Sequence, residues 1–145
     1  MPPALTDVTV RLFPGGVICR RTFPGRSDQI PRVRRFIRFL LEDSPCRDDA
    51  EQVVAELAAN AITHTGSGRF NGTFTVKLTR RAGGVRITVY DRGGGATPRF
   101  DSRGDTDPFA EHGRGLALVA ALASRVGCRG TRATGHAVWA ELSPM

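Results

Sequence analysis

The chain has 145 residues, of which 40% are hydrophobic and 24% charged, enough for one domain with one core and too few for two of ordinary size. No apolar run approaches the roughly 20 residues of a membrane span, and residues 1–7 lack the charged-then-apolar layout of a signal peptide. Three widely spaced cysteines, Cys19, Cys46 and Cys128, suggest neither a disulfide framework nor a CxxC metal site. We therefore expect a single cytoplasmic domain over residues 1–145 with reduced, mostly packed thiols.

The chain is strongly basic. Its net charge is +7 at pH 7, and Lys77 is the only lysine among the 21 basic residues. Such a balance permits an acidic partner, such as a nucleotide or a nucleic acid. The arginines are spread along the whole chain and aromatic residues are few, which disfavours a stacking platform for single-stranded nucleic acid. We expect neither a direct nucleic-acid partner nor a membrane partner.

The first half of the chain predicts a hairpin and two helices. Val8, Val10 and Leu12 alternate with polar residues before the turn sequence Pro14-Gly15-Gly16, which is typical of a hairpin. Ser27 and Asp28 are suited to begin a helix that ends near Ser44-Pro45, because apolar residues recur there at helical spacing. Asp48 and Asp49 offer caps for a second helix, which Thr65-Gly66-Ser67-Gly68 stops.

The second half predicts strands separated by a long loop and one helix. Alternating apolar residues indicate strands around 74–78 and 85–89, joined by a turn at 81–84. Residues 92–112 show no periodicity, and loops of this length are usually lids or binding loops. A third helix is expected from Gly113, followed by strands near 126–132 and 136–142. This order predicts an α+β two-layer sandwich, with helices on one face of a mostly antiparallel sheet.

Glu56 and Asn60 are four residues apart on the second predicted helix, so their side chains project from the same side, one turn apart. An Asn carbonyl oxygen is a suitable magnesium ligand, and a carboxylate beside it can orient or deprotonate a nucleophile. By itself the spacing is also that of an ordinary solvated helix surface, since such pairs are common by chance.

Asp91 continues the alternation of Val85, Ile87 and Val89, which turns its side chain toward the buried face at the end of that strand. A buried carboxylate needs a partner. Two interpretations stay open: it caps the glycine turn that follows, or it accepts a hydrogen bond from a ligand such as the exocyclic amine of adenine.

Two glycine-bearing segments follow. Gly93, Gly94 and Gly95 permit close backbone approach to a ligand, or simply make a flexible turn, and they match neither a P-loop nor a dinucleotide-binding fingerprint. Gly113-Arg114-Gly115 precedes the third predicted helix, where backbone N–H groups and Arg114 could bind phosphate, unless the segment is only a hinge.

The histidines suggest no site of their own. The spacing of His64, His112 and His136 is not that of a metal-ligand set. We expect these three residues and Trp139 to have surface or packing roles.

Three segments together resemble the boxes of the GHKL ATPase/kinase superfamily: residues 56–61 (ELAANA), 91–95 (DRGGG) and 113–119 (GRGLALV). The continuation AITHT after Asn60 and the ending AVWAEL at 137–142 look like the single-domain anti-sigma factor serine/threonine kinases that are numerous in actinomycetes. This resemblance covers nearly the whole chain.

The resemblance implies the Bergerat fold with ATP and Mg²⁺ as cofactors. It implies that Asn60 binds magnesium, that Glu56 is the general base and that Asp91 binds adenine. Gly93, Gly95, Gly113 and Gly115, with Arg114, would form the adenine loop and the phosphate lid. The implied partners are a sigma factor, which is sequestered, and an anti-sigma antagonist of STAS type, which is phosphorylated on serine or threonine.

Two other functions remain as alternatives, and homodimerisation stays open. In the first, ATP orders the lid and creates a partner surface but no phosphate is transferred. In the second, which we rank last, the chain is a basic nucleic-acid binder with steeply salt-dependent affinity.

Overall fold

A computed structural model of the protein describes residues 8–64, 68, 72–92, 111–131 and 133–144. Three hairpins supply all the strands: β1 (Thr9–Phe13) with β2 (Gly16–Pro24), β3 (Thr73–Arg81) with β4 (Gly84–Tyr90), and β5 (Arg125–Thr131) with β6 (Gly135–Leu142). The helices are a short 3-10 turn (Ser27–Gln29), α1 (Ile30–Leu40), α2 (Arg47–His64) and α3 (Glu111–Leu122). The predicted order of elements is therefore confirmed.

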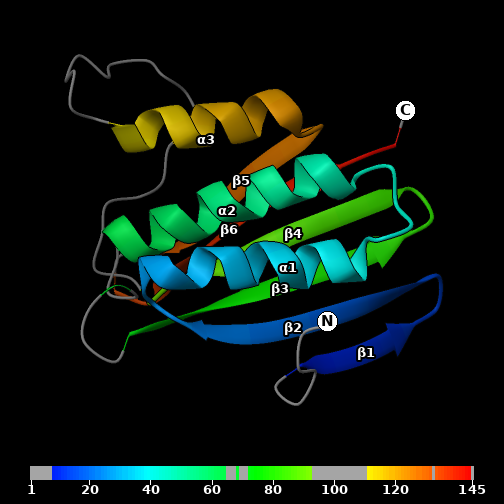
Figure 1. Ribbon diagram of the computed structural model, residues 1–145, viewed down its shortest axis with the longest axis horizontal. Helices are drawn as coiled ribbons and strands as arrows, with labels where there is room; N and C mark the ends of the chain where they lie inside the picture. The colour runs from blue at the N-terminus through cyan, green and yellow to red at the C-terminus, as the bar shows by residue number, and fades with distance from the viewer. Residues whose placement is uncertain (1–7, 65–67, 69–71, 93–110, 132, 145) are drawn as a thin grey trace.

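The six strands form one antiparallel sheet in the order β1-β2-β3-β4-β6-β5. Strands that follow one another in the sequence form the hairpins. In contrast, β4 pairs with β6 although α3 and β5 lie between them in the sequence. At the β1–β2 turn, Gly15 has a φ of 92°, a backbone conformation that residues with a Cβ rarely adopt. The three helices lie on one side of the sheet (Figure 1), which confirms the predicted two-layer α+β sandwich.

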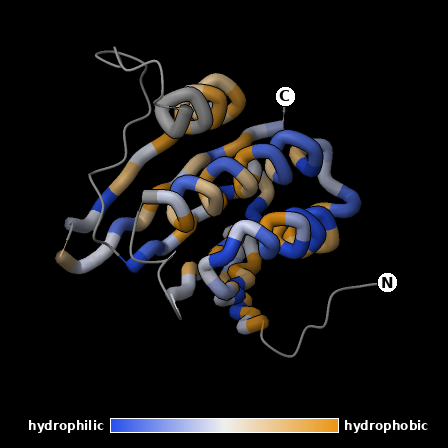
Figure 2. Tube along the Cα trace, turned by 60° about the vertical axis from the view of Figure 1, so that its left-hand side comes forward, coloured by the Kyte–Doolittle hydropathy of each residue, from blue (hydrophilic) through white to orange (hydrophobic). Residues whose placement is uncertain are grey.

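The core lies between the helices and the sheet. Phe23 of β2 stacks on Phe74 of β3 at 5.7 Å between ring centroids and meets Phe36 of α1 edge-on at 5.9 Å. Helices α1 and α2 alternate hydrophobic and hydrophilic positions along each turn, whereas α3 is more uniformly hydrophobic (Figure 2). Each helix buries its apolar side, including Val33 and Ile37 of α1, Val53, Val54, Leu57 and Ala58 of α2, and Leu116 and Val119 of α3.

Four helix ends differ from the prediction. Helix α1 begins at Ile30, because Ser27 and Asp28 lie in the short 3-10 turn before it. Helix α1 ends at Leu40, before the expected Ser44-Pro45, because Leu41 leaves helical geometry (φ −117°, ψ 24°) while Arg80 of β3 donates a hydrogen bond to the Leu40 carbonyl at 3.2 Å. Asp48 and Asp49 lie in the first turn of α2 instead of capping it, where their charges favour the helix dipole. Helix α3 begins at Glu111, two residues before Gly113.

Two remaining expectations concern the membrane and the cysteines. In the part of the chain that the structure describes, no helix has the length and apolar character needed to cross a membrane. The three cysteines are free, Cys19 and Cys46 being buried and Cys128 half-buried, as expected for packed thiols.

We predict that Phe36→Ala lowers the free energy of unfolding by about 3 to 5 kcal/mol, because it empties a site with no exposed surface in the aromatic cluster. Phe39, on the same helix, is 37% exposed, and Phe39→Ala should cost less than about 1 kcal/mol. Urea denaturation of both variants measures the difference. Equal losses would contradict the assignment of the core.

Candidate nucleotide-binding site

Helix α2 divides its side chains between the core and solvent. Its sheet-facing positions are buried, whereas Glu56 and Asn60 are partly exposed and follow the exposed Gln52 along one outer ridge at four-residue spacing. Neither the Glu56 nor the Asn60 side chain forms a hydrogen bond or ion pair with another residue that the structure describes. The predicted pair therefore shares one partly exposed side of the helix.

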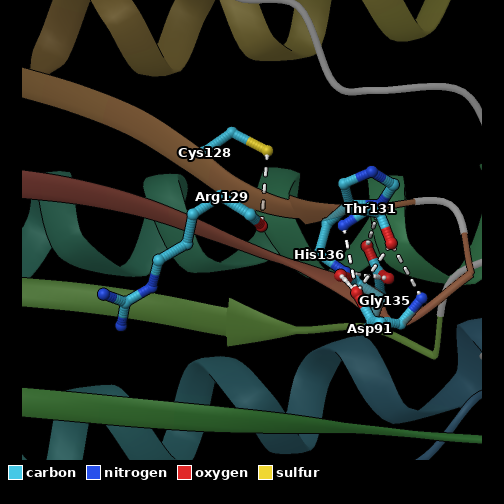
Figure 3. A network of polar contacts seen from close by, with 7 residues as sticks. Asp91, Cys128, Arg129, Thr131, Gly135 and His136 are labelled. Carbon is cyan, nitrogen blue, oxygen red and sulfur yellow. Dashed lines mark hydrogen bonds and ion pairs between the residues drawn. The ribbon is translucent and has the colours of Figure 1, made fainter.

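Asp91 directly follows β4, and its side chain is 1% exposed. Its backbone N–H donates to the His136 carbonyl at 2.9 Å, and the His136 N–H donates to Asp91 Oδ1 at 2.8 Å. Figure 3 shows this carboxylate against the start of β6. The prediction that Asp91 points to the buried face is confirmed, and the β6 backbone supplies a partner that the sequence did not indicate.

The His136 imidazole lies beside the Asp91 carboxylate, with 3.7 Å between His136 Nδ1 and Asp91 Oδ2. Its side chain is fully buried, and neither ring nitrogen has a hydrogen bond within the described part of the chain. Buried polar atoms nearly always have a partner. The burial of His136 matches the packing role, and not the surface role, that was expected for it, and the Asp91 carboxylate is the charged group beside its Nδ1.

Sequence reasoning did not connect His136 with Asp91, because 45 positions separate them. The pairing of Tyr90 with Ala137 in the β4–β6 ladder brings them together. The period-2 pattern of both strands could have placed both side chains on the helix side of the sheet, but it could not have shown that β4 and β6 are neighbours.

Cys128 of β5 lies in the same region (Figure 3). Burial, and secondarily the negative charge of Asp91, raise the pKa of the Cys128 thiol. A raised pKa keeps this thiol protonated at neutral pH, and a protonated thiol is a poor nucleophile. We therefore assign Cys128 no chemical role.

A pocket of about 310 Å³ opens where β4 and β5 end and β6 begins, and its lining includes Asp91 and His136 together with Tyr90 and Arg129. Glu56 and Asn60 are not part of its lining. At this same end of the molecule lie the C-terminal end of α2, the end of β4 and the start of α3 (Figure 1). The fold thus gathers at one end the elements that carry the predicted residues.

The glycine segments are only partly described. Gly113, Arg114 and Gly115 lie within the first turns of α3 and do not precede it, so the backbone N–H groups of Gly113 and Arg114 are among the first four of the helix, which have no partner inside it. Gly93 and Gly95 lie outside the described residues, as do residues 93–110 of the loop predicted over 92–112. Within the described residues, no three His, Cys, Asp or Glu side chains gather as a metal-ligand group.

Comparison with known proteins decides the family. Residues 23–142 match the sequence profile of the histidine kinase-like ATPase domain. The chain belongs to this family. A search of curated proteins finds no match. The matched range covers every element from the end of β2 to the end of β6, so this histidine kinase-like ATPase domain contains α2, Asp91 and α3, and ATP binding, usually with Mg²⁺, follows from the family.

For this histidine kinase-like ATPase domain we predict that Asp91→Ala lowers the free energy of unfolding by about 1 to 3 kcal/mol, because the buried His136 N–H loses its acceptor. Asp91→Asn retains an oxygen at that position and should cost clearly less. Thermal or urea unfolding of both variants measures the effect. If the two substitutions cost the same, the hydrogen bond to β6 is not what holds Asp91.

Proposed function

We propose that this chain is a cytoplasmic anti-sigma regulatory factor that binds ATP and Mg²⁺, sequesters a sigma factor and phosphorylates a serine or threonine on an antagonist of STAS type. The observation that supports it best is the outer ridge of α2, which presents Glu56 and Asn60 within a histidine kinase-like ATPase domain. The anti-sigma part rests on the resemblance of residues 61–65 and 137–142 to that branch.

The donor set on α2 fits magnesium. The Asn60 amide oxygen is a hard ligand of the kind that Mg²⁺ accepts, and Mg²⁺ normally takes only one or two ligands from the protein. Bound with ATP, the metal would neutralise negative charge on the phosphates. Glu56, one turn earlier on the same ridge, would accept the proton of the attacking hydroxyl group.

Asp91 would bind the adenine base of the nucleotide. Its carboxylate is held by the β6 backbone, so it would meet an adenine amine as a fixed hydrogen-bond acceptor. Guanine presents a carbonyl at the equivalent position, which would place two acceptors against each other in a buried site. Gly93 and Gly95 would let the backbone approach the base, and Gly113, Arg114 and Gly115 would bind phosphate at the start of α3.

We predict that Asn60→Ala and Glu56→Ala fail in different ways. Asn60→Ala should raise the dissociation constant of Mg-ATP, because a metal ligand is lost. Glu56→Ala should leave that constant nearly unchanged and slow phosphotransfer by about 100- to 10,000-fold, the usual range for a lost general base. Calorimetry measures binding, and transfer of radiolabel from ATP to the cognate antagonist measures the reaction.

Gln52 provides the matched control, because it is exposed on the same ridge one turn before Glu56, and Gln52→Ala should change neither quantity. Sigma-factor binding should survive Glu56→Ala. Equal loss of ATP affinity in both variants would refute the two roles. ATP-dependent partner binding without transfer by the unmodified protein would instead favour a nucleotide-gated binding module.

A separate prediction concerns recognition of the adenine base by Asp91. Asp91→Asn should reduce the preference for ATP over GTP by about 5- to 150-fold, which corresponds to about 1 to 3 kcal/mol for a mismatched buried pair. Competition calorimetry with the two nucleotides measures this preference. An unchanged preference would limit Asp91 to its structural bond with β6.

A further inference from the structure

The sheet has an open face, which we define as the side opposite α1, α2 and α3 (Figure 1). Strand register and side-chain alternation place one basic residue or more from each of the strands β1 to β5 on this open face. Glu141 is the acidic residue of the described strands on that side. The basic residues are Arg11, Arg20, Lys77, Arg81, Arg86, Arg125 and Arg129.

This face holds most of the charge excess of the described residues. It carries seven basic residues against one acidic residue, whereas the other described residues comprise ten basic and nine acidic ones. The other described residues are therefore nearly neutral together, and the open face is strongly positive. The arginines are spread along the sequence, but the strand register gathers seven basic residues on this one face.

The Trp139 and Tyr90 rings and the one acid of the open face already have partners within the chain. The Arg86 guanidinium lies 4.3 Å from the Trp139 ring centroid, and the Arg20 guanidinium lies 5.5 Å from the Tyr90 ring centroid. Arg86 Nε also donates to Glu141 Oε1 at 3.0 Å, and this hydrogen bond lowers the pKa of Glu141. The rings are thus covered by guanidinium groups, and Glu141 is neutralised by Arg86.

We propose that the open face docks a carboxylate-rich surface of a partner protein. Arginine side chains bind carboxylates through two parallel hydrogen bonds, and opposite charge on the two surfaces favours encounter. Single-stranded nucleic acid needs free rings on which bases stack, and these rings are covered. Reading a duplex groove needs a protruding helix or ribbon, whereas the described part of this face is the surface of a six-stranded sheet.

Lys77 makes this docking directly measurable, because the only lysine of the chain lies on the open face between Arg20 and Thr88 in the strand register. A carbodiimide condenses a carboxylate with an amine to an amide and takes up the water that is released. We would incubate the full chain with an amino-terminally acetylated polyglutamate peptide at about 150 mM salt, where long-range attraction is screened. Mass spectrometry should find the peptide on Lys77.

Matched variants separate the open face from net charge. Arg11→Gln with Arg20→Gln should lower cross-linking to Lys77 and the affinity measured by anisotropy about tenfold, since each exposed ion pair contributes modestly. Arg34→Gln with Arg35→Gln, on exposed positions of α1, changes the charge equally and should alter both by less than about twofold. Lys77→Arg should abolish the cross-link and preserve binding.

Three outcomes would overturn the proposal. The peptide could be attached only at the amino terminus of the protein, or the two double variants could lose cross-linking and affinity equally. The third outcome is that single-stranded RNA or duplex DNA binds more tightly than the peptide at the same salt concentration. The last would assign the face to nucleic acid. None of these measurements needs ATP or phosphotransfer, so their failure is distinguishable from failure of the proposed kinase activity.

Discussion

The pairing of β4 with β6 is the constraint on which the rest of the structure depends. It joins two parts of the sheet that hairpins alone could not connect, namely the strands β1 to β4 and the C-terminal hairpin of β5 and β6. It also places Asp91 at the start of β6, where the backbone N–H of His136 fixes the carboxylate. A buried carboxylate without such a donor would be costly, so the same pairing closes the sheet and makes Asp91 tolerable in the interior.

Helix α2 keeps stability and chemistry on separate sides. Val53, Val54 and Leu57 are buried between α2 and the sheet, and this burial fixes the helix in place. Glu56 and Asn60 lie on the outer ridge and contribute little to the core. A rigid helix that is held by its apolar side can present polar groups in a constant orientation, which a flexible loop does not do.

The two faces of the sheet have different physical roles. One face is covered by helices and contains the aromatic cluster of Phe23, Phe36 and Phe74. The open face carries the basic excess, and its guanidinium groups cover Trp139 and Tyr90. Long arginine side chains can shield apolar surface while their charged ends stay in water, which explains how this face remains uncovered by helices while Trp139 and Tyr90 are only partly exposed.

The sequence by itself determined the class of the fold and the positions of most elements, because local periodicity reports which side of a strand or helix is apolar. It also indicated Glu56 and Asn60 as a pair, since a separation of four residues within one helix is a local property. Helix ends were less accurate. The end of α1 at Leu40 depends on Arg80, forty residues away, whose hydrogen bond no local pattern contains.

Only the tertiary structure decided which strands are neighbours, and therefore which distant residues meet. Asp91 and His136 are adjacent because β4 pairs with β6, and the basic residues share one face because all six strands join one sheet with a common register. Each strand shows its own alternation in the sequence, but the alternation does not state which strand lies beside it. Strand order is set by the burial of the whole sheet under three helices, which is a property of the complete chain.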